Sequence, residues 1–142
     1  MIGRVVIHET IDNDGRLKMK VTALNGEVLG DVEGFQDYGF ASRPNKGAEG
    51  ILNSVMGERA RAVIAATEDR EARPKDLKGG EAAVYTKEDR ASGGKHRLHF
   101  KQGREVHLTC SKFVITTGHT TFVMDGPGVT ITTPPLDLVK TE

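Results

Sequence analysis

Short runs of β-favouring residues, each closed by glycine, proline, asparagine or aspartate, fill almost the whole of this 142-residue chain. The windows with helical composition contain strand-forming residues or end at a proline. Strands that recur between turn residues predict an all-β protein. The expected strands are 4–10, 17–24, 28–35, 48–55, 61–67, 82–86, 96–101, 105–110, 112–117, 121–125 and 129–132.

The first five runs predict a small closed barrel. Residues 17–24 alternate between apolar and polar side chains, as in a strand with one face in water. Asn25-Gly26, which follows, is a strong hairpin turn because both residues tolerate a positive φ angle. Five strands in about 70 residues is the strand count of a Greek-key barrel such as the oligonucleotide/oligosaccharide-binding (OB) fold. We expect this OB-fold domain to cover residues 1–74.

The pattern changes after Pro74. The remaining runs are shorter, are separated by glycine corners, and become rich in threonine and β-branched residues towards the C-terminus. This spacing favours a winding β-helix over a second barrel. Each run has one apolar face, and no helix is expected that would cover it.

Association of three chains would cover these apolar faces. Fragments of two or three strands are marginal in water, whereas three copies wound about one axis bury each inward face against two others. We therefore expect residues 75–142 to form an intertwined, trimeric, triple-stranded β-helix. The expected trimer core consists of Val106, Leu108, Cys110, Phe113, Ile115, Phe122, Met124, Val129 and Ile131. Val114 and Val123 compete for the same role, so either alternating set of side chains is a candidate for the inward face.

Charge and composition argue against several classes of function. The 20 basic and 20 acidic residues balance, so no net charge draws the chain towards nucleic acid or an anionic membrane. No apolar run is long enough for a membrane-spanning helix or typical of a signal peptide. A local basic cluster contains one aromatic residue, Phe100, for base stacking, and we expect it to form a wet outer face. The cluster consists of Lys87, Arg90, Lys95, Arg97, Lys101 and Arg104.

No catalytic or metal site is expected. The single cysteine, Cys110, has apolar strand neighbours and no cation beside it, so we interpret it as a packing residue. It also excludes an internal disulfide and fits folding in a reducing cytoplasm. Acidic pairs lie in turns or beside basic residues, which favours solvated charges over a glycosidase pair. Threefold symmetry would bring three copies of His119 together, so an axial metal site is the alternative to a solvated loop histidine.

An ordered series of short motifs runs from Gly26 to Thr86. They include Gly26-Glu27-Val28, Asp31-Val32-Glu33, Phe35-Gln36, Tyr38-Gly39-Phe40, Gly47-Ala48-Glu49, Val63-Ile64-Ala65, Asp69-Arg70, Arg73-Pro74, Gly80-Glu81 and Tyr85-Thr86. This series resembles the Mu-type baseplate spike family, also called baseplate assembly protein V. The similarity covers residues 3–100 at the level of motifs and the threonine-rich remainder by type.

The resemblance implies an OB domain followed by a triple-stranded β-helix, which forms a needle at the centre of a contractile phage or prophage baseplate. It implies a structural protein and not an enzyme, located in the virion tail after synthesis in the host cytoplasm. The partners it implies are two further copies of the chain, the baseplate hub protein, and the outer membrane and envelope that the needle punctures. No nucleic-acid partner is expected.

The chain departs from the family pattern at both ends. It starts close to the first expected strand, and it lacks the His-x-His pair with which the family's tip binds iron. We therefore expect no tip metal and no other cofactor, and interpret the chain as truncated, decayed, or completed by a separate tip protein. Two alternative functions are the spike of a related contractile machine, such as a type VI secretion or bacteriocin needle, and an OB-fold module that binds oligonucleotides or oligosaccharides.

Overall fold

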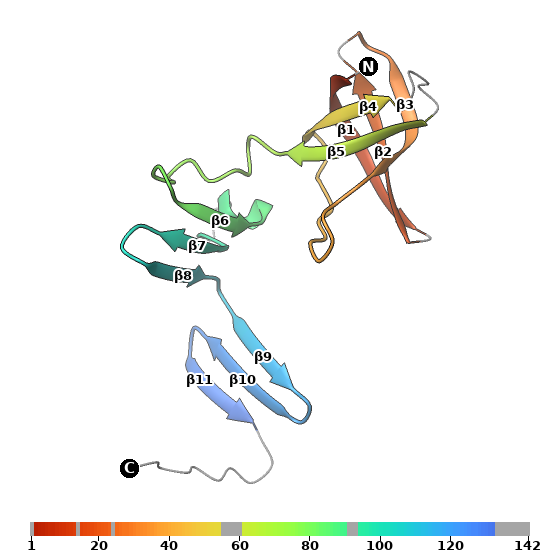
Figure 1. Ribbon diagram of the computed structural model, residues 1–142. Coiled ribbons are helices and arrows are strands. Elements are labelled where there is room, and N and C mark those ends of the chain that lie inside the picture. Colours follow the sequence, from red (N-terminus) through yellow and green to blue (C-terminus); the bar gives the residue numbers. More distant parts are fainter. Residues whose placement is uncertain (1, 14, 24, 55–60, 91–93, 133–142) are drawn as a thin grey trace, which may run out of the picture. The chain divides into compact units, whose positions relative to one another are not determined.

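The computed structural model describes residues 2–13, 15–23, 25–54, 61–90 and 94–132 (Figure 1). The chain divides into two compact units, Met1–Arg73 and Pro74–Glu142. The described residues are almost entirely strands and turns, so the prediction of an all-β protein is confirmed. Among them, no helix is long and apolar enough to cross a membrane.

The first unit is a closed five-stranded barrel. Its strands are β1 (Ile2–Asn13), β2 (Arg16–Ala23), β3 (Val28–Gly34), β4 (Glu49–Ser54) and β5 (Ala62–Glu68). The strand order is β1-β2-β3-β5-β4, with β4 paired back onto β1. β3 and β5 run parallel, and the other neighbours are antiparallel. The predicted barrel is therefore confirmed, and its closure leaves no free sheet edge.

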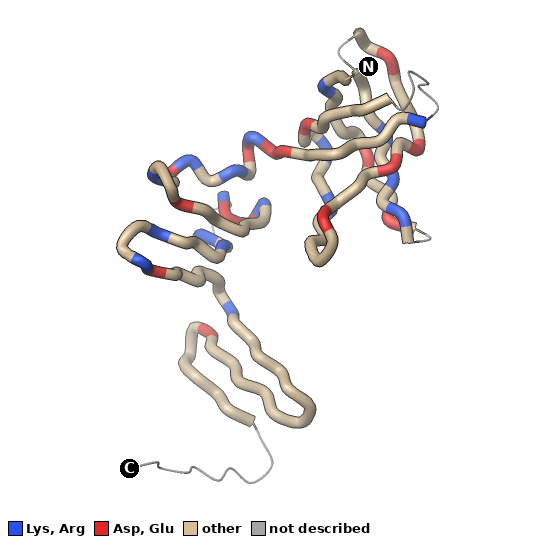
Figure 2. The backbone as a smooth tube through the Cα atoms, viewed as in Figure 1, with Lys and Arg blue, Asp and Glu red and all other residues tan. Residues whose placement is uncertain are grey.

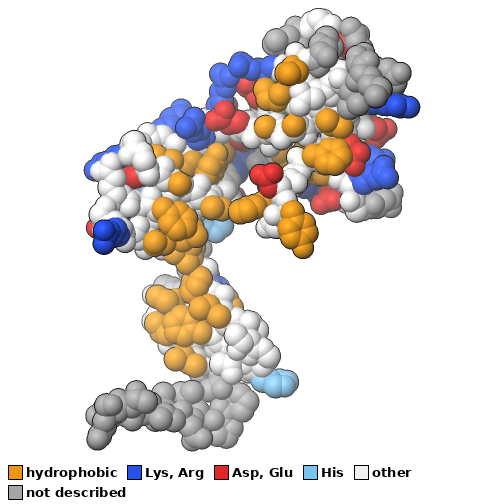
Figure 3. Space-filling model, in the orientation of Figure 1, with side chains coloured by type: hydrophobic (Ala, Val, Ile, Leu, Met, Phe, Trp, Pro, Cys, Tyr) orange, Lys and Arg blue, Asp and Glu red, His pale blue; other side chains and the backbone are white. Residues whose placement is uncertain are grey.

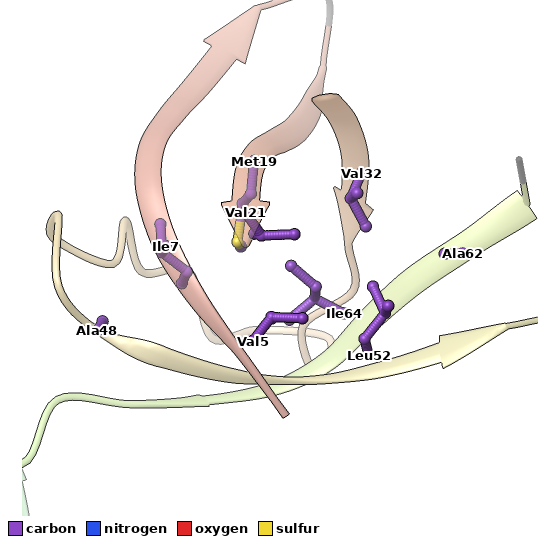
Figure 4. Close-up of a cluster of buried hydrophobic side chains, with 9 residues drawn as sticks. All are labelled: Val5, Ile7, Met19, Val21, Val32, Ala48, Leu52, Ala62 and Ile64. Atoms are coloured by element: carbon purple, nitrogen blue, oxygen red, sulfur yellow. The ribbon is translucent and has the colours of Figure 1, made fainter. Parts of the chain in front are cut away.

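Aliphatic side chains fill the barrel and point towards one another inside it (Figure 4). The buried cluster consists of Val5, Ile7, Met19, Val21, Val32, Ala48, Leu52, Ala62 and Ile64. Packing is close beside Gly50, where a Cβ atom would lie 3.1 Å from Ile64 Cγ2. Full burial of one valine, leucine or isoleucine side chain contributes about 1.5–3 kcal/mol, so this cluster is the main source of the barrel's stability.

The second unit contains two three-stranded antiparallel sheets. The first comprises β6 (Ala82–Tyr85), β7 (Arg97–Lys101) and β8 (Glu105–Thr109), with the 3₁₀ helix η3 (Lys87–Arg90) between β6 and β7. The second comprises β9 (Phe113–Thr117), β10 (Thr120–Asp125) and β11 (Gly128–Thr132). All six predicted strands of this part are present, and in the single chain they form two meanders.

Charge is distributed unevenly among these elements (Figure 2). Acidic and basic residues are interspersed over the barrel and the β6–β8 sheet, whereas the β9–β11 segment contains a single charged residue, Asp125.

The tight turn between β7 and β8 contains Gly103 at a φ of 82°, a conformation that glycine adopts without steric cost.

Candidate assembly interface

The β9–β11 sheet gathers its largest apolar side chains on one face, together with Thr117 and Thr120 at one end. Residues that lie directly opposite each other on paired strands point to the same face. By the register of the two strand pairs, one face carries Phe113, Ile115, Phe122, Met124, Val129 and Ile131. The opposite face carries Val114, Thr116, Thr121, Val123, Thr130 and Thr132. The six residues of this sheet that were predicted for the trimer core therefore share one face.

That apolar face is open to solvent in the single chain. No residue of β9, β10 or β11 is buried; each is exposed or half-buried. Figure 3 shows hydrophobic side chains gathered over the visible face of this sheet. A sheet with one strongly apolar face and no covering layer has no dry interior of its own.

The β6–β8 sheet is also apolar on one side. Its register places on that face Ala82, Val84, Leu98, Phe100, Val106 and Leu108. These side chains are exposed or half-buried in the described structure. Cys110, which follows β8 directly, is half-buried. The predicted core residues Val106 and Leu108 thus lie on an uncovered apolar face.

On the opposite, polar face of the same sheet, the side chains of Arg97 and His99 are buried. Arg97 Nε donates to Asp89 Oδ1 at 2.7 Å, and Arg97 Nη1 donates to Asp76 Oδ1 at 2.7 Å. The side chains of Arg97 and Asp89 are only 4% and 0% exposed. Lys95 Nζ donates to the second oxygen of Asp76 at 2.6 Å. The expectation that the basic cluster would form a wet face is therefore wrong for Arg97, because this guanidinium is buried between two carboxylates.

These ion pairs shift the pKa values of the groups involved. Hydrogen bonds from Lys95, and then from Arg97, hold the pKa of Asp76 well below its usual range. The hydrogen bond to Asp89 raises the pKa of Arg97. Both shifts favour the charged forms of Asp76 and Arg97.

Glu81 is the centre of a second polar cluster at the other end of β7. It accepts hydrogen bonds from the backbone N–H groups of Lys78 and Gln102, and its Oε2 lies 3.1 Å from His99 Nε2. The bond from the Lys78 N–H is the largest cause that lowers the pKa of Glu81 to about 2. His99 is buried, like Arg97 on the same face.

The second unit therefore has no apolar interior. Among its described residues, the buried ones are Pro74, Asp89, Arg97 and His99, of which three are ionisable. Sequence patterns missed this network, because its partners are up to 21 residues apart and belong to no periodic motif. The alternation of apolar residues in the strands, in contrast, pointed directly to the exposed faces.

The histidines and the cysteine do not converge. His119 is exposed in the β9–β10 turn, and His107 pairs with the exposed Glu105 at 2.7 Å. Within the described ranges, no three His, Cys, Asp or Glu side chains are grouped closely enough to hold a metal ion.

The surface of the barrel carries a polar hollow of about 360 Å³. It is lined by His8, Glu9, Thr10, Arg43, Pro44, Asn45 and Lys46. The Arg43 guanidinium is already engaged with Thr10 through two hydrogen bonds, of 3.0 and 2.7 Å. The lining contains no Phe, Tyr or Trp ring, and its one imidazole, that of His8, is hydrogen-bonded to Thr22 Oγ1 at 2.7 Å.

Known proteins match this chain over most of its length. Residues 4–71 match the family described as bacteriophage Mu Gp45, N-terminal. The Mu-like prophage FluMu protein gp45 of Haemophilus influenzae is 33% identical over 117 residues, which cover 82% of this chain and 60% of that protein. The baseplate puncturing device gp45 of Escherichia phage Mu is 31% identical over 134 residues, which cover 93% of this chain and 64% of that protein.

The chain thus spans about three fifths of the length of the curated relatives that it matches. The family match falls on the barrel, and the two pairwise matches extend into the second unit. The resemblance indicated by the motifs is therefore confirmed: the chain is similar to the phage Mu gp45 proteins, and residues 4–71 match the N-terminal region of that family.

Proposed function

We propose that the chain is the central spike of a contractile phage or prophage tail baseplate, and that it punctures the host cell envelope during injection. One matched relative bears the name baseplate puncturing device, and the other is a prophage protein. Both names favour a phage tail over a type VI secretion or bacteriocin needle. The proposed role is mechanical and not enzymatic.

We propose an OB domain over residues 1–74 and a triple-stranded β-helix shaft over residues 75–142, in a homotrimer. The barrel order, with β4 between β1 and β5 and with β3 parallel to β5, supports the OB assignment. The proposed trimer core consists of Val106, Leu108, Cys110, Phe113, Ile115, Phe122, Met124, Val129 and Ile131. The register of β9–β11 supports this set over Val114 and Val123, which lie among threonines.

The observation that carries the proposal is the distribution of side chains in the second unit, which buries an ion pair and exposes large apolar residues, the reverse of an ordinary protein core. Burial of apolar surface gains about 25 cal/mol per Å², so covering both exposed faces is the strongest available driving force for association. Three wound chains would cover each face without exposing sheet edges. The hydrogen bonds between wound chains would also give a shaft the lateral stiffness that puncturing requires.

The proposed partners are two further copies of the chain, the baseplate hub, and the outer membrane and envelope of the target cell. We propose that the protein is made in the host cytoplasm and becomes part of the virion tail. No metal, cofactor or nucleic acid is part of this proposal; the balance of 20 basic and 20 acidic residues gives the chain no net attraction for nucleic acid.

Sedimentation of the full chain and labelling of tail particles test the proposal together. We expect the mass of a trimer at micromolar concentration, and antibodies against the chain should bind purified contractile particles at the baseplate tip. A folded monomer would contradict the trimeric shaft. A trimer found along the sheath, or absent from the particles, would contradict the spike assignment instead.

A further inference from the structure

The connection between β3 and β4 displays three aromatic side chains to solvent. Tyr38 is fully exposed, and Phe40 and Phe35 are 70% and 60% exposed. We call residues 35–42 the loop tip; Figure 1 shows the connection that carries it projecting from the barrel. Aromatic side chains are the usual anchors of protein interfaces, so the loop tip is a candidate contact surface.

Hydrogen bonds fix the shape of the loop tip. The Gln36 side-chain amide donates to the Ser42 carbonyl oxygen at 2.6 Å, and the Ser42 N–H donates to Gln36 Oε1 at 2.8 Å. Between these residues, the Phe40 N–H donates to the Asp37 carbonyl oxygen at 3.0 Å, and Gly39 has a φ of 87°. That angle matches the third position of a type II β-turn, so the exposed tyrosine lies at the corner of the turn. A preorganised turn loses little conformational entropy on binding.

A second set of hydrogen bonds fixes the segment that lines the polar hollow of the barrel. The Arg43 guanidinium donates to Thr10 twice, as described above. The Gly47 N–H donates to the Ile7 carbonyl oxygen, and the Ile7 N–H donates to the Ala48 carbonyl oxygen, both at 2.8 Å. These bonds tie the segment to β1, so the walls of the hollow are in place before anything binds there, as in most ligand sites.

The charges of the loop tip and of the polar hollow are complementary. Two cations, Arg43 and Lys46, line the hollow together with one carboxylate, that of Glu9. Lys46 forms no ion pair with another described residue. The single charge of the loop tip is the exposed carboxylate of Asp37, which is also unpaired within the described ranges. A ring beside a carboxylate suits a hollow with two cations, because cations are attracted both to aromatic faces and to negative charge.

The loop tip leaves the polar hollow of its own chain open. Tyr38 is fully exposed, and no residue of the loop tip lines the hollow. A projection and a complementary recess at different places on one surface form a heterologous contact, which closes into a ring when a rotation relates the copies.

The trimer proposed above supplies the copies for such a ring. It carries three barrels, each joined to its β6 strand by residues 69–81. Joining several contact surfaces in one particle raises their effective concentration, which reaches the millimolar range for short flexible linkers. A contact of modest strength between neighbouring barrels is then sufficient.

We propose that the loop tip of one copy docks in the polar hollow of the next, with the Tyr38 ring against the Arg43 guanidinium and the Asp37 carboxylate paired with Lys46. Repeated around the threefold axis, this contact joins the three barrels in a ring. The inference rests on the trimer of the proposed function, because that trimer supplies the neighbouring copy.

Photo-cross-linking between two different chains tests this docking. One chain carries Tyr38→p-benzoylphenylalanine, which keeps an aromatic ring at the loop tip; a co-expressed chain of the natural sequence carries a tag. Irradiation should give a covalent pair of unlike chains, with the probe joined to a peptide that contains Arg43 and Lys46. The matched control, Ile2→p-benzoylphenylalanine, lies at the start of β1 and is 78% exposed. It should give about tenfold less of that pair.

A charge reversal tests the pairing itself. Lys46→Glu in both chains should lower the cross-link yield of the Tyr38 probe about fivefold, the effect of losing one exposed ion pair. Adding Asp37→Lys should restore the yield, because opposite charges then face each other again. The control Arg16→Glu, an equal change of net charge at the exposed start of β2, should leave the yield unchanged.

Three results would overturn the docking and leave the spike proposal intact. They are equal yields from the Tyr38 and Ile2 probes in a trimer, a yield that Lys46→Glu does not change, and a probe that cross-links in purified tail particles to a different baseplate protein and not between copies. A monomer in sedimentation would overturn both proposals.

Discussion

The ion pairs around Arg97 are the principal place where the second unit excludes water. The guanidinium bridges Asp89, which is fully buried, and Asp76, which is half-exposed. The Asp89 Oδ1 atom also accepts the backbone N–H of His96 at 3.0 Å. A buried ion pair of this kind adds little net stability compared with apolar packing, but breaking it is costly. Its structural effect is to hold the polar face of β6–β8 inward and so to turn the apolar face outward.

Replacement of Arg97 tests this role. Arg97→Met leaves the Asp89 carboxylate buried without a cation, so we expect the free energy of unfolding to fall by about 3–5 kcal/mol, measured by urea denaturation. The double variant Arg97→Met/Asp89→Leu should recover most of that loss. Glu105→Gln, which breaks an exposed pair with His107, is the control and should cost less than about 1 kcal/mol. An equal loss in the control would rule out a special role for the buried network.

Glu81 makes the stability of the same sheet depend on pH. Its pKa is lowered from 4.5 to about 2 in the folded protein, so its contribution is complete above pH 4.5 and is lost as the pH falls through 2. The lowered pKa of Asp76 acts in the same direction. We expect the melting temperature of the wild type to drop across this range, and Glu81→Gln to melt lower at pH 7 with a shallower drop. Parallel curves for the two proteins would contradict this assignment.

At the scale of elements, the strands were predictable because turn residues lie at both ends of each strand. All eleven expected strands are present, and their ends differ from the expected ones by at most three residues. The 3₁₀ helix η3 was not predicted, since its four polar residues carry no periodic signal. The hydrogen bonds between the Gln36 side chain and Ser42, in the connection between β3 and β4, were also missed, because they depend on side-chain geometry and not on residue spacing.

The two faces of β9–β11 required the strand register. In the sequence, the set with Phe122 was the expected inward face, and Val114 and Val123 competed with it for that role. Pairing of the three strands assembles six large apolar residues with two threonines on one side, and four threonines with two valines and Asp125 on the other. Periodicity within one strand cannot show this, since it does not say which residues of different strands stand opposite each other.

Two adjacent positions on β10 distinguish these faces. Met124→Glu would place an unpaired charge in the proposed trimer core, at a cost of several kcal/mol per copy, and we expect it to sediment as a monomer. Val123→Glu is the matched control on the threonine face and should remain trimeric. If Val123→Glu dissociated the trimer and Met124→Glu did not, the proposed inward face would be the wrong one.

At the scale of the whole molecule, the two units differ in how far they bury their apolar residues. Among the described residues, the barrel encloses nine buried apolar side chains within one chain, whereas the second unit encloses ion pairs and leaves its apolar residues exposed or half-buried. The scarcity of aromatic residues and the 17 glycines already indicated that one chain had too little material for a full core. The barrel is therefore expected to fold within a single chain, and the second unit to depend on association.

The placement of the two tyrosines has a practical consequence for spectroscopy. The chain has no tryptophan, so its near-ultraviolet emission comes from Tyr38 and Tyr85. Tyr38 is exposed to solvent on the loop between β3 and β4, whereas Tyr85 is half-buried in β6. A collisional quencher such as iodide would reach the first ring far more readily than the second. The intrinsic fluorescence of the unlabelled protein therefore reports, in real time, whether the tip of that loop is wet or covered.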